Sequence, residues 1–213
     1  MKKLLTGALG ILLLAVAAAA LVQAGCVDVA ADTPHSPLVY RLIEWTRERS
    51  VDRQSQDVAP PANLAEPERI RRGAGNYDAM CADCHTAPGR EDSELRKGLY
   101  PQPPDFSRRA AESGDSGREN ARRFWIIKHG IKASAMPAWS RAGVDDEGVW
   151  DLVAFLKVLP GLSAEDYRRQ VESSDGHRHG GMNAQHSPPP TGADRHPSAS
   201  AHEPIHHHPA HAH

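Results

Sequence analysis

Hydrophobic positions in residues 66–163 recur at the spacing of short amphipathic helices. Pro67 suits the first turn of one helix, and Asp145 is a suitable N-cap for another. Gly130 and the pair Pro160–Gly161 are stop signals, and no alternation long enough for a β-strand separates the stripes. The pattern therefore predicts an all-α domain with three main helices. The residues that mark these helices are Ile70, Ala74, Tyr77 and Cys81; Ala121, Phe124, Trp125, Ile127 and Lys128; and Val149, Leu152, Val153, Leu156 and Leu159.

The N-terminus carries a longer apolar run. Leu4 to Val22 is a stretch of 19 uncharged residues that follows two lysines. A bilayer span takes about 20 such residues, and a signal-peptide core usually has about 7–15. The lysines should stay on the cytoplasmic side, so that the rest of the chain is exported. We expect residues 1–26 to be a retained membrane helix. The alternatives are a signal peptide cleaved after Val22-Gln23-Ala24 and, less favoured, lipid attachment at Cys26.

Residues 27–65 predict one more helix and a linker. Ser36 can cap a helix that begins at Pro37, and the stretch 57–64 contains the proline-rich sequence of a linker. This helix suits a membrane interface, and docking on the rest of the chain or on a partner remains an equal alternative. Its apolar residues are Leu38, Val39, Leu42, Ile43 and Trp45, with Tyr40 and several arginines beside them.

The C-terminal region, assigned to residues 164–213, has the composition of a disordered tail. From about Ser173 onward it is dominated by His, Pro, Ser, Ala and Gly, and it holds ten of the thirteen histidines. Clustered imidazoles bind Cu, Ni or Zn ions. Metal delivery and a solvated tail with incidental metal affinity both remain open. The candidate ligands are His177, His179, His206, His207 and His208.

Residues 81–85 read Cys-Ala-Asp-Cys-His, the spacing of a covalently attached c-type haem. Two thiols on one helical turn can form thioethers with haem, and the adjacent histidine can then bind the iron. A zinc site needs two further ligands, whereas the remaining cysteine, Cys26, lies in the apolar leader. A thioredoxin-like pair needs a βαβ context, which is absent. Cys81 and Cys84 are the predicted anchors of one haem c, and His85 is its proximal ligand.

The sixth iron ligand is predicted to be Met136. Pro137 prevents the chain from returning to a helix directly after it, so the thioether lies on a short, stiff loop. A His/Met pair raises the reduction potential and fills the last open position of the iron. Met80 lies on the proximal side, Met182 is in the polar tail, and His129 suits the last turn of a helix.

Three blocks of the chain resemble the class I mono-haem cytochromes c: residues 73–85, 136–139 and 150–156. The resemblance implies the cytochrome c fold around one covalent haem. It also implies a close crossing of the first and last helices, with Gly73 or Gly75 and Tyr77 against Trp150 or Phe155. By the same resemblance, Pro104 should accept a hydrogen bond from the proximal histidine, and Trp139 should pack near the haem edge.

These observations lead us to expect an electron carrier rather than an enzyme. It would pass single electrons from a quinol-oxidising complex or dehydrogenase to an oxidase or reductase, without a small-molecule substrate. The haem domain should lie in the periplasm, tethered to the inner membrane or soluble after cleavage. Alternatives are a copper- or nickel-handling protein that uses its tail and, less favoured, a haem peroxidase. A net charge of −2 gives no case for nucleic-acid binding.

Overall fold

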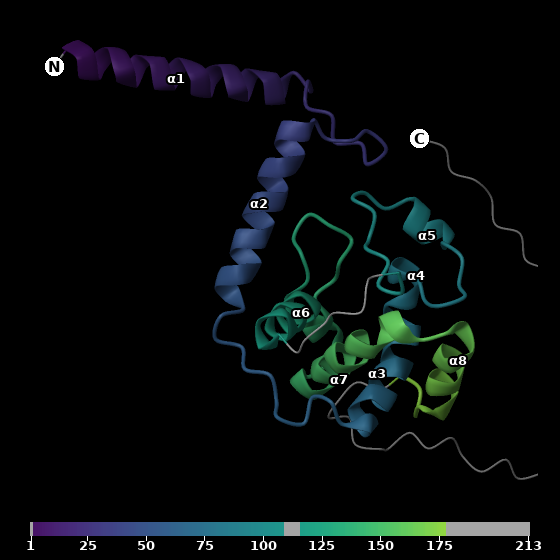
Figure 1. Cartoon of the computed structure of the whole chain (residues 1–213). Coiled ribbons are helices and arrows are strands. Elements are labelled where there is room, and N and C mark those ends of the chain that lie inside the picture. The colour runs from purple at the N-terminus through teal and green to yellow at the C-terminus, as the bar shows by residue number, and fades with distance from the viewer. Residues whose placement is uncertain (1, 109–115, 178–213) are drawn as a thin grey trace, which may run out of the picture. The chain divides into compact units, whose positions relative to one another are not determined.

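A computed structural model describes residues 2–108 and 116–177, and no β-strand occurs among them (Figure 1). This confirms the all-α prediction. The elements are α1 (Lys2–Gln23), α2 (Pro37–Gln54), α3 (Pro67–Met80), α4 (Ala82–His85), α5 (Glu94–Lys97), α6 (Gly117–His129), the 3₁₀ turn η1 (Trp139–Ala142), α7 (Asp146–Val158), the 3₁₀ turn η2 (Leu159–Gly161) and α8 (Ala164–Ser173).

The crossing of α3 and α7 organises the core (Figure 1). A Cβ atom on Gly73 would lie 2.1 Å from the carbonyl oxygen of Asp151 and 2.8 Å from Cβ of Phe155. Only glycine lets the two helices approach this closely. The rings of Tyr77 and Phe155, both fully buried, then lie 5.4 Å apart between the helices. Of the two glycines that the sequence offered for this crossing, Gly73 is the one at the contact.

A buried ion-pair network joins the same two helices. The Asp151 carboxylate, 5 % exposed, accepts hydrogen bonds from Arg69 at 3.0 Å and from Arg72 at 2.6 and 2.9 Å. Arg69 is also buried and donates to Glu147 at 2.6 Å. Each buried charge of this network therefore has a partner of opposite charge, which offsets the free-energy cost of removing it from water.

Helix α8 lies against α3 and is an addition to the predicted fold. Ser163 caps it, and Tyr167 is buried and donates to Asp78 of α3 at 2.8 Å. Residues after α8 continue along α3, where a Cβ on Gly75 would lie 2.4 Å from Oγ of Ser174. The sequence division at residue 163 placed α8 in the tail. That boundary did not include α8 in the folded domain, because this short helix is mostly polar and depends on contacts with residues distant in sequence.

Helix α6 packs on α7, and the C-terminal half of α2 packs on α6. Phe124 of α6 stacks on Trp150 at 4.3 Å between ring centroids. Arg122 of α6 forms ion pairs with Glu48 and Asp52 of α2, and Val51 of α2 is buried beside them. The sequence signals for these elements were right, because Ser36 caps α2, Gly130 ends α6 and Asp145 caps α7.

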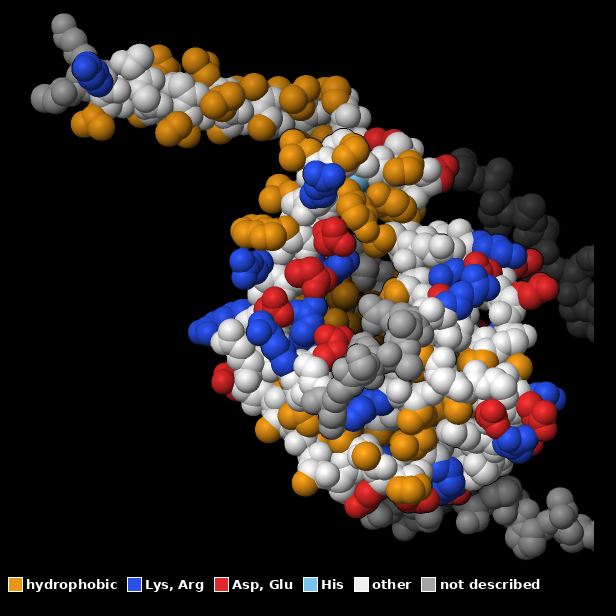
Figure 2. Space-filling model, in the orientation of Figure 1, with side chains coloured by type: hydrophobic (Ala, Val, Ile, Leu, Met, Phe, Trp, Pro, Cys, Tyr) orange, Lys and Arg blue, Asp and Glu red, His pale blue; other side chains and the backbone are white. Residues whose placement is uncertain are grey.

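Helix α1 is the one described helix that is long and apolar enough to cross a membrane. Its side chains are exposed (Figure 2). Such a helix near the N-terminus is compatible with either a transmembrane helix or a signal peptide. The choice among anchor, cleaved leader and lipidated Cys26 therefore stays a prediction.

Candidate functional site

The two candidate anchor cysteines lie on the turn that joins α3 to α4. Cys81 follows the last residue of α3, and its carbonyl oxygen accepts hydrogen bonds from the backbone N–H groups of Cys84 at 3.1 Å and of His85 at 2.8 Å. Both thiols are free and half-buried. One hydrogen-bonded turn thus holds two sulfur atoms and an imidazole together, which is the arrangement needed to attach and ligate one haem.

The imidazole of His85 is oriented by the backbone at Pro104. Nδ1 of His85 lies 2.9 Å from the carbonyl oxygen of Pro104. With the proton on Nδ1 the ring donates to this carbonyl, and Nε2 keeps its lone pair for a metal. The ring of Phe106 stacks on that of His85, with 4.5 Å between the ring centroids and an angle of 19° between the rings. The ring of His85 is therefore held by both a hydrogen bond and a stacked neighbour.

Arg96 holds the loop that supplies this carbonyl. The side chain belongs to α5, is buried, and donates from Nη2 to the carbonyl oxygen of Pro103 at 2.9 Å. Its Nη1 donates to Asp92 at 2.8 Å, while Nε is buried without a partner. Ser93 caps α5 through the backbone N–H of Arg96. A buried cation thus fixes the residue directly before Pro104.

A second set of contacts fixes the chain where it leaves the haem motif. The hydroxyl of Tyr77 donates to the carbonyl oxygen of Thr86 at 2.8 Å. Thr86 has φ of 61°, a left-handed backbone that non-glycine residues adopt only at a cost. Tyr77 therefore connects the helix crossing to the candidate site. Its ring packs on Phe155, and its hydroxyl binds the backbone of Thr86, the residue after His85.

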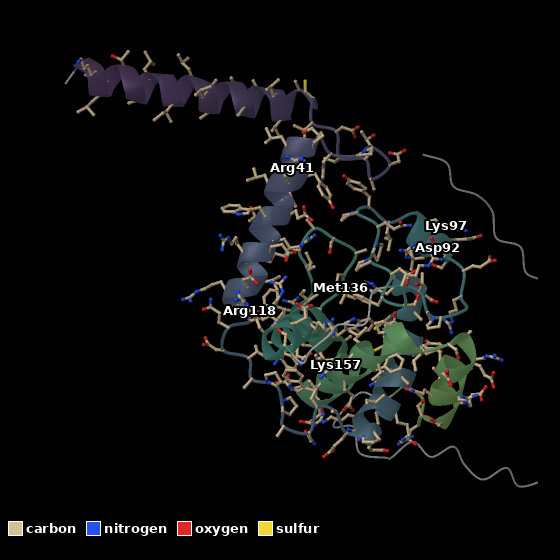
Figure 3. The ribbon with its side chains drawn as sticks, in the orientation of Figure 1. Arg41, Asp92, Lys97, Arg118, Met136 and Lys157 are labelled. Carbon is tan, nitrogen blue, oxygen red and sulfur yellow. The ribbon has the colours of Figure 1, made fainter. Side chains whose placement is uncertain are left out.

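Met136 lies on a tight loop between α6 and η1. The backbone N–H of Ile131 donates to the carbonyl oxygen of Met136 at 3.2 Å, and the hydroxyl of Ser134 accepts from the N–H of Met136 at 3.1 Å. Gly130 has φ of 66°, and a Cβ there would lie 2.7 Å from the same Met136 oxygen. The Met136 side chain is half-buried against the core, and Figure 3 shows it toward the middle of the molecule. Trp139, in η1, is also half-buried against the core.

The electrostatic environment favours neutral ligands. Burial lowers the pKa of His85; the bond to Pro104 opposes this change and the nearby charge of Arg96 adds to it. The imidazole therefore stays uncharged, as a metal ligand must be. Burial, with a smaller effect of Cys84, raises the pKa of Cys81 to about 12. Burial and then Asp83 also raise the pKa of Cys84.

The rival ligands do not share this setting. Met80 is in the last turn of α3, immediately before Cys81. His129 is exposed in the last turn of α6, where its ring lies 5.1 Å from that of Trp125. Met182 and the tail residues His179, His206, His207 and His208 lie outside the described residues. His177 is exposed, and residues 2–108 and 116–177 contain no group of three or more potential His, Cys, Asp or Glu metal ligands.

Sequence reasoning missed the residues that support the candidate site. Arg96 carried no recognisable sequence signal, and Phe106 followed a proline-rich stretch without an assigned role. Tyr77 was assigned to the helix crossing, but not to the hydrogen bond with Thr86. These roles depend on how the segment with Pro103 and Pro104 folds back on α4, and no local sequence pattern predicts that contact.

The residues present fit a covalent haem c. They supply two uncharged thiols on one turn, an imidazole whose Nδ1 is committed to a carbonyl, and a thioether held against the core by a stiff loop. Haem c needs this donor chemistry, namely two thioether bonds and one or two neutral axial ligands. The buried, unpartnered Nε of Arg96, on α5, is a further donor near His85.

Comparison with known proteins agrees with this geometry. Residues 68–156 match the family of the cytochrome c oxidase, cbb3-type, subunit III. No curated protein and no solved structure matched the chain. The matched range contains the haem motif, the segment with Pro103 and Pro104, the loop with Met136 and most of α7. Residues 68–156 are therefore a cytochrome c domain, which implies haem c and an electron-transfer function, and the all-helical fold is consistent with the class I c-type cytochromes.

Proposed function

We propose that the protein is a single-electron carrier in which Cys81 and Cys84 bind one haem covalently and His85 and Met136 are the axial ligands. The observation that carries this proposal is the 2.9 Å contact between Nδ1 of His85 and the carbonyl oxygen of Pro104. It commits one nitrogen of the imidazole and leaves the other for the iron.

The bound haem would supply a one-electron Fe(III)/Fe(II) couple whose potential depends on its axial ligands. The Pro104 carbonyl makes the His85 imidazole a stronger donor and fixes its ring plane. Met136 offers a soft, neutral sulfur that favours the ferrous state. Because Gly130, Ser134 and Pro137 hold this loop, the ligand geometry should change little between the two oxidation states.

The same arrangement argues for a carrier rather than an enzyme. A catalytic haem needs an open coordination position for its substrate, whereas side chains of this chain would fill both axial positions. Partly buried Trp139 and Phe106 add apolar surface around the site and limit the access of water. The protein would therefore exchange electrons with other redox proteins through the haem edge and would bind no small-molecule substrate.

We infer that this exchange takes place at the periplasmic face of the inner membrane. The apolar helix α1 begins with two lysines, which favours export of everything after it. A quinol-oxidising complex or dehydrogenase would supply the electrons, and an oxidase or reductase would accept them. Intact mass of the native protein tests this placement, because it reports the covalent haem and the presence or loss of the leader together.

The axial assignment is tested with two matched methionine variants of the haem-loaded protein. Met136→Ala should abolish the weak near-infrared charge-transfer band of methionine bound to ferric haem and should lower the reduction potential. Met80→Ala, next to the haem motif, should keep both. Survival of the band in Met136→Ala would show that another group ligates the iron. Pigment that acid–acetone extracts from the unaltered protein would refute covalent attachment.

A further inference from the structure

We propose that the N-terminal half of α2 is a docking surface for an anionic lipid bilayer. The surface, called the interfacial face below, consists of Leu38, Val39, Leu42, Ile43 and Trp45. Their exposed fractions are 79, 44, 60, 50 and 60 % respectively. The described part of the chain shows no comparable group of large exposed apolar side chains outside α1. Exposed apolar surface on this scale marks an interaction site.

Most of the interfacial face points away from α6 of the cytochrome domain. At about 100° per residue, Val39, Leu42 and Ile43 fall on the side of α2 opposite Glu48 and Val51. Glu48 forms an ion pair with Arg122 of α6, and Val51 is 2 % exposed against the domain. A haem held by His85 and Met136 inside the domain therefore does not cover these three residues. The interfacial face needs an occupant from outside the domain.

The charge pattern of α2 selects an anionic surface. Arg49 and Arg53 continue the line of Leu38, Leu42 and Trp45 toward the C-terminus, and both are exposed. Arg41 is exposed in the apolar half itself (Figure 3). Of the three acidic residues of α2, Glu48 and Asp52 face α6, where Arg122 pairs with them, and Glu44 pairs with Arg47 on the same helix. The outward face is thus apolar at one end and basic at the other.

This distribution matches a helix that lies in the membrane interface. Such helices bury apolar side chains about 5–10 Å deep, at the boundary between headgroups and acyl chains, and place basic residues beside lipid phosphates. Trp45 and Tyr40 have the amphipathic rings that concentrate at this depth. Arg49 and Arg53 would then lie at the headgroups while Leu38 and Leu42 enter the acyl region.

The position of α2 in the chain provides the tether. Only the 13 residues 24–36 separate the end of α1 from the start of α2. Fully extended, they reach at most about 45 Å at about 3.5 Å per residue. If α1 stays in a membrane, α2 is confined close to that surface and its local concentration there is high. Docking would also hold α6 near the bilayer, because Arg122 joins the two helices.

Collision accessibility of a spin label tests the proposal in the full-length, haem-loaded protein. A nitroxide is placed by Leu42→Cys in a Cys26→Ser background. The matched control carries it at the exposed position Glu172 of α8, by Glu172→Cys in the same background. The vesicles contain equal parts phosphatidylcholine and phosphatidylglycerol. At residue 42 we expect collisions with oxygen to exceed those with a water-soluble nickel chelate several-fold. At residue 172 the order should be reversed.

The remaining outcomes overturn the proposal. A label at residue 42 that is as accessible to nickel as the control leaves no lipid contact. A label shielded from both reagents indicates a protein partner, and spin–spin broadening that disappears on dilution with unlabelled protein identifies a second copy. Flotation of the protein with its vesicles reports the anchor α1 separately. The near-infrared band of Met136 independently reports whether the electron-carrier proposal holds.

Discussion

The crossing of α3 and α7 is held by different forces from the two loops of the candidate site, one with Pro103 and Pro104 and the other with Met136. At the crossing, Gly73 brings the backbones together over the buried rings of Tyr77 and Phe155, and Asp151 pairs with two arginines. The loops bury few apolar side chains. Single hydrogen bonds hold them instead, such as those at Pro104, Pro103 and Ser134.

This difference separates stability from ligand geometry. The crossing places Cys81 at the end of a rigid helix and supplies most of the burial that opposes unfolding. The loops decide how His85 and Met136 are presented. Substitutions at the crossing should therefore change the free energy of unfolding, and substitutions in the loops should change the haem spectrum and potential before they change stability.

The largest effect is expected at Asp151. Asp151→Ala removes the carboxylate that pairs with Arg69 and leaves a buried guanidinium with less compensation. We expect a loss of about 3–5 kcal/mol in the free energy of unfolding, measured by denaturant titration of the haem-loaded protein. Glu147→Gln is the control, because Glu147 pairs with the same arginine but is 68 % exposed, so it should cost less than about 1 kcal/mol. Equal losses in the two variants would contradict the importance of burial.

Gly73→Ala should have the next largest effect. The added methyl group would lie 2.1 Å from a backbone oxygen of α7, so the helices must separate. Overpacking of this kind costs about 1–3 kcal/mol, and backbone contact favours the upper end. Gly98→Ala is the control, since its nearest neighbouring atom would be 3.6 Å away. An unchanged unfolding midpoint in Gly73→Ala would place the close contact elsewhere.

Arg96→Gln tests the loop side of the comparison. It removes the donor to the carbonyl oxygen of Pro103 and should cost about 1–2 kcal/mol of stability. Because Pro103 precedes the residue that orients His85, the reduction potential should shift as well, while the helix content stays unchanged. Exposed Lys97 lies on the same short helix, so Lys97→Gln should leave the stability and the potential unaltered. A stability loss in Arg96→Gln without any change in potential would reduce Arg96 to a purely structural role.

The smallest effect concerns the pH dependence of the α2–α6 contact. Burial raises the pKa of Glu48, but hydrogen bonds from Arg47 and Arg122 outweigh it, so the net pKa lies below the ordinary 4.5. A lowered pKa means that the contact contributes fully above 4.5 and is lost as the pH falls through the folded-state value. Since Glu48 is partly exposed, the change should not exceed about 1 kcal/mol.

The measurement for Glu48 is the mobility of a nitroxide on α2 at Gln54→Cys, followed from neutral pH downward. We expect the label to become more mobile below the ordinary carboxyl range. Glu48→Gln should already be mobile at neutral pH and should show a smaller pH response. Parallel curves for the two proteins would mean that Glu48 does not hold α2 on α6.

Much of the fold followed from local patterns. Apolar spacing predicted the core helices, and the caps at Ser36 and Asp145 and the stop at Gly130 act within one helical turn. Helix α8 escaped this reasoning because its burial depends on Tyr167 meeting Asp78, 89 residues away. This short helix is mostly polar and offers only two large apolar residues, Tyr167 and Val171, so composition placed it in the tail.

The haem attachment motif was readable because its chemistry is covalent and local: two thiols and an imidazole must occupy neighbouring positions on one turn. Long-range contacts required the tertiary structure. It decided that Gly73 rather than Gly75 lies at the crossing, that Pro104 faces His85, and that Arg96 and Phe106 support the site. Spacing along the chain determines which groups share a turn, whereas packing between distant segments determines which of several similar residues makes the contact.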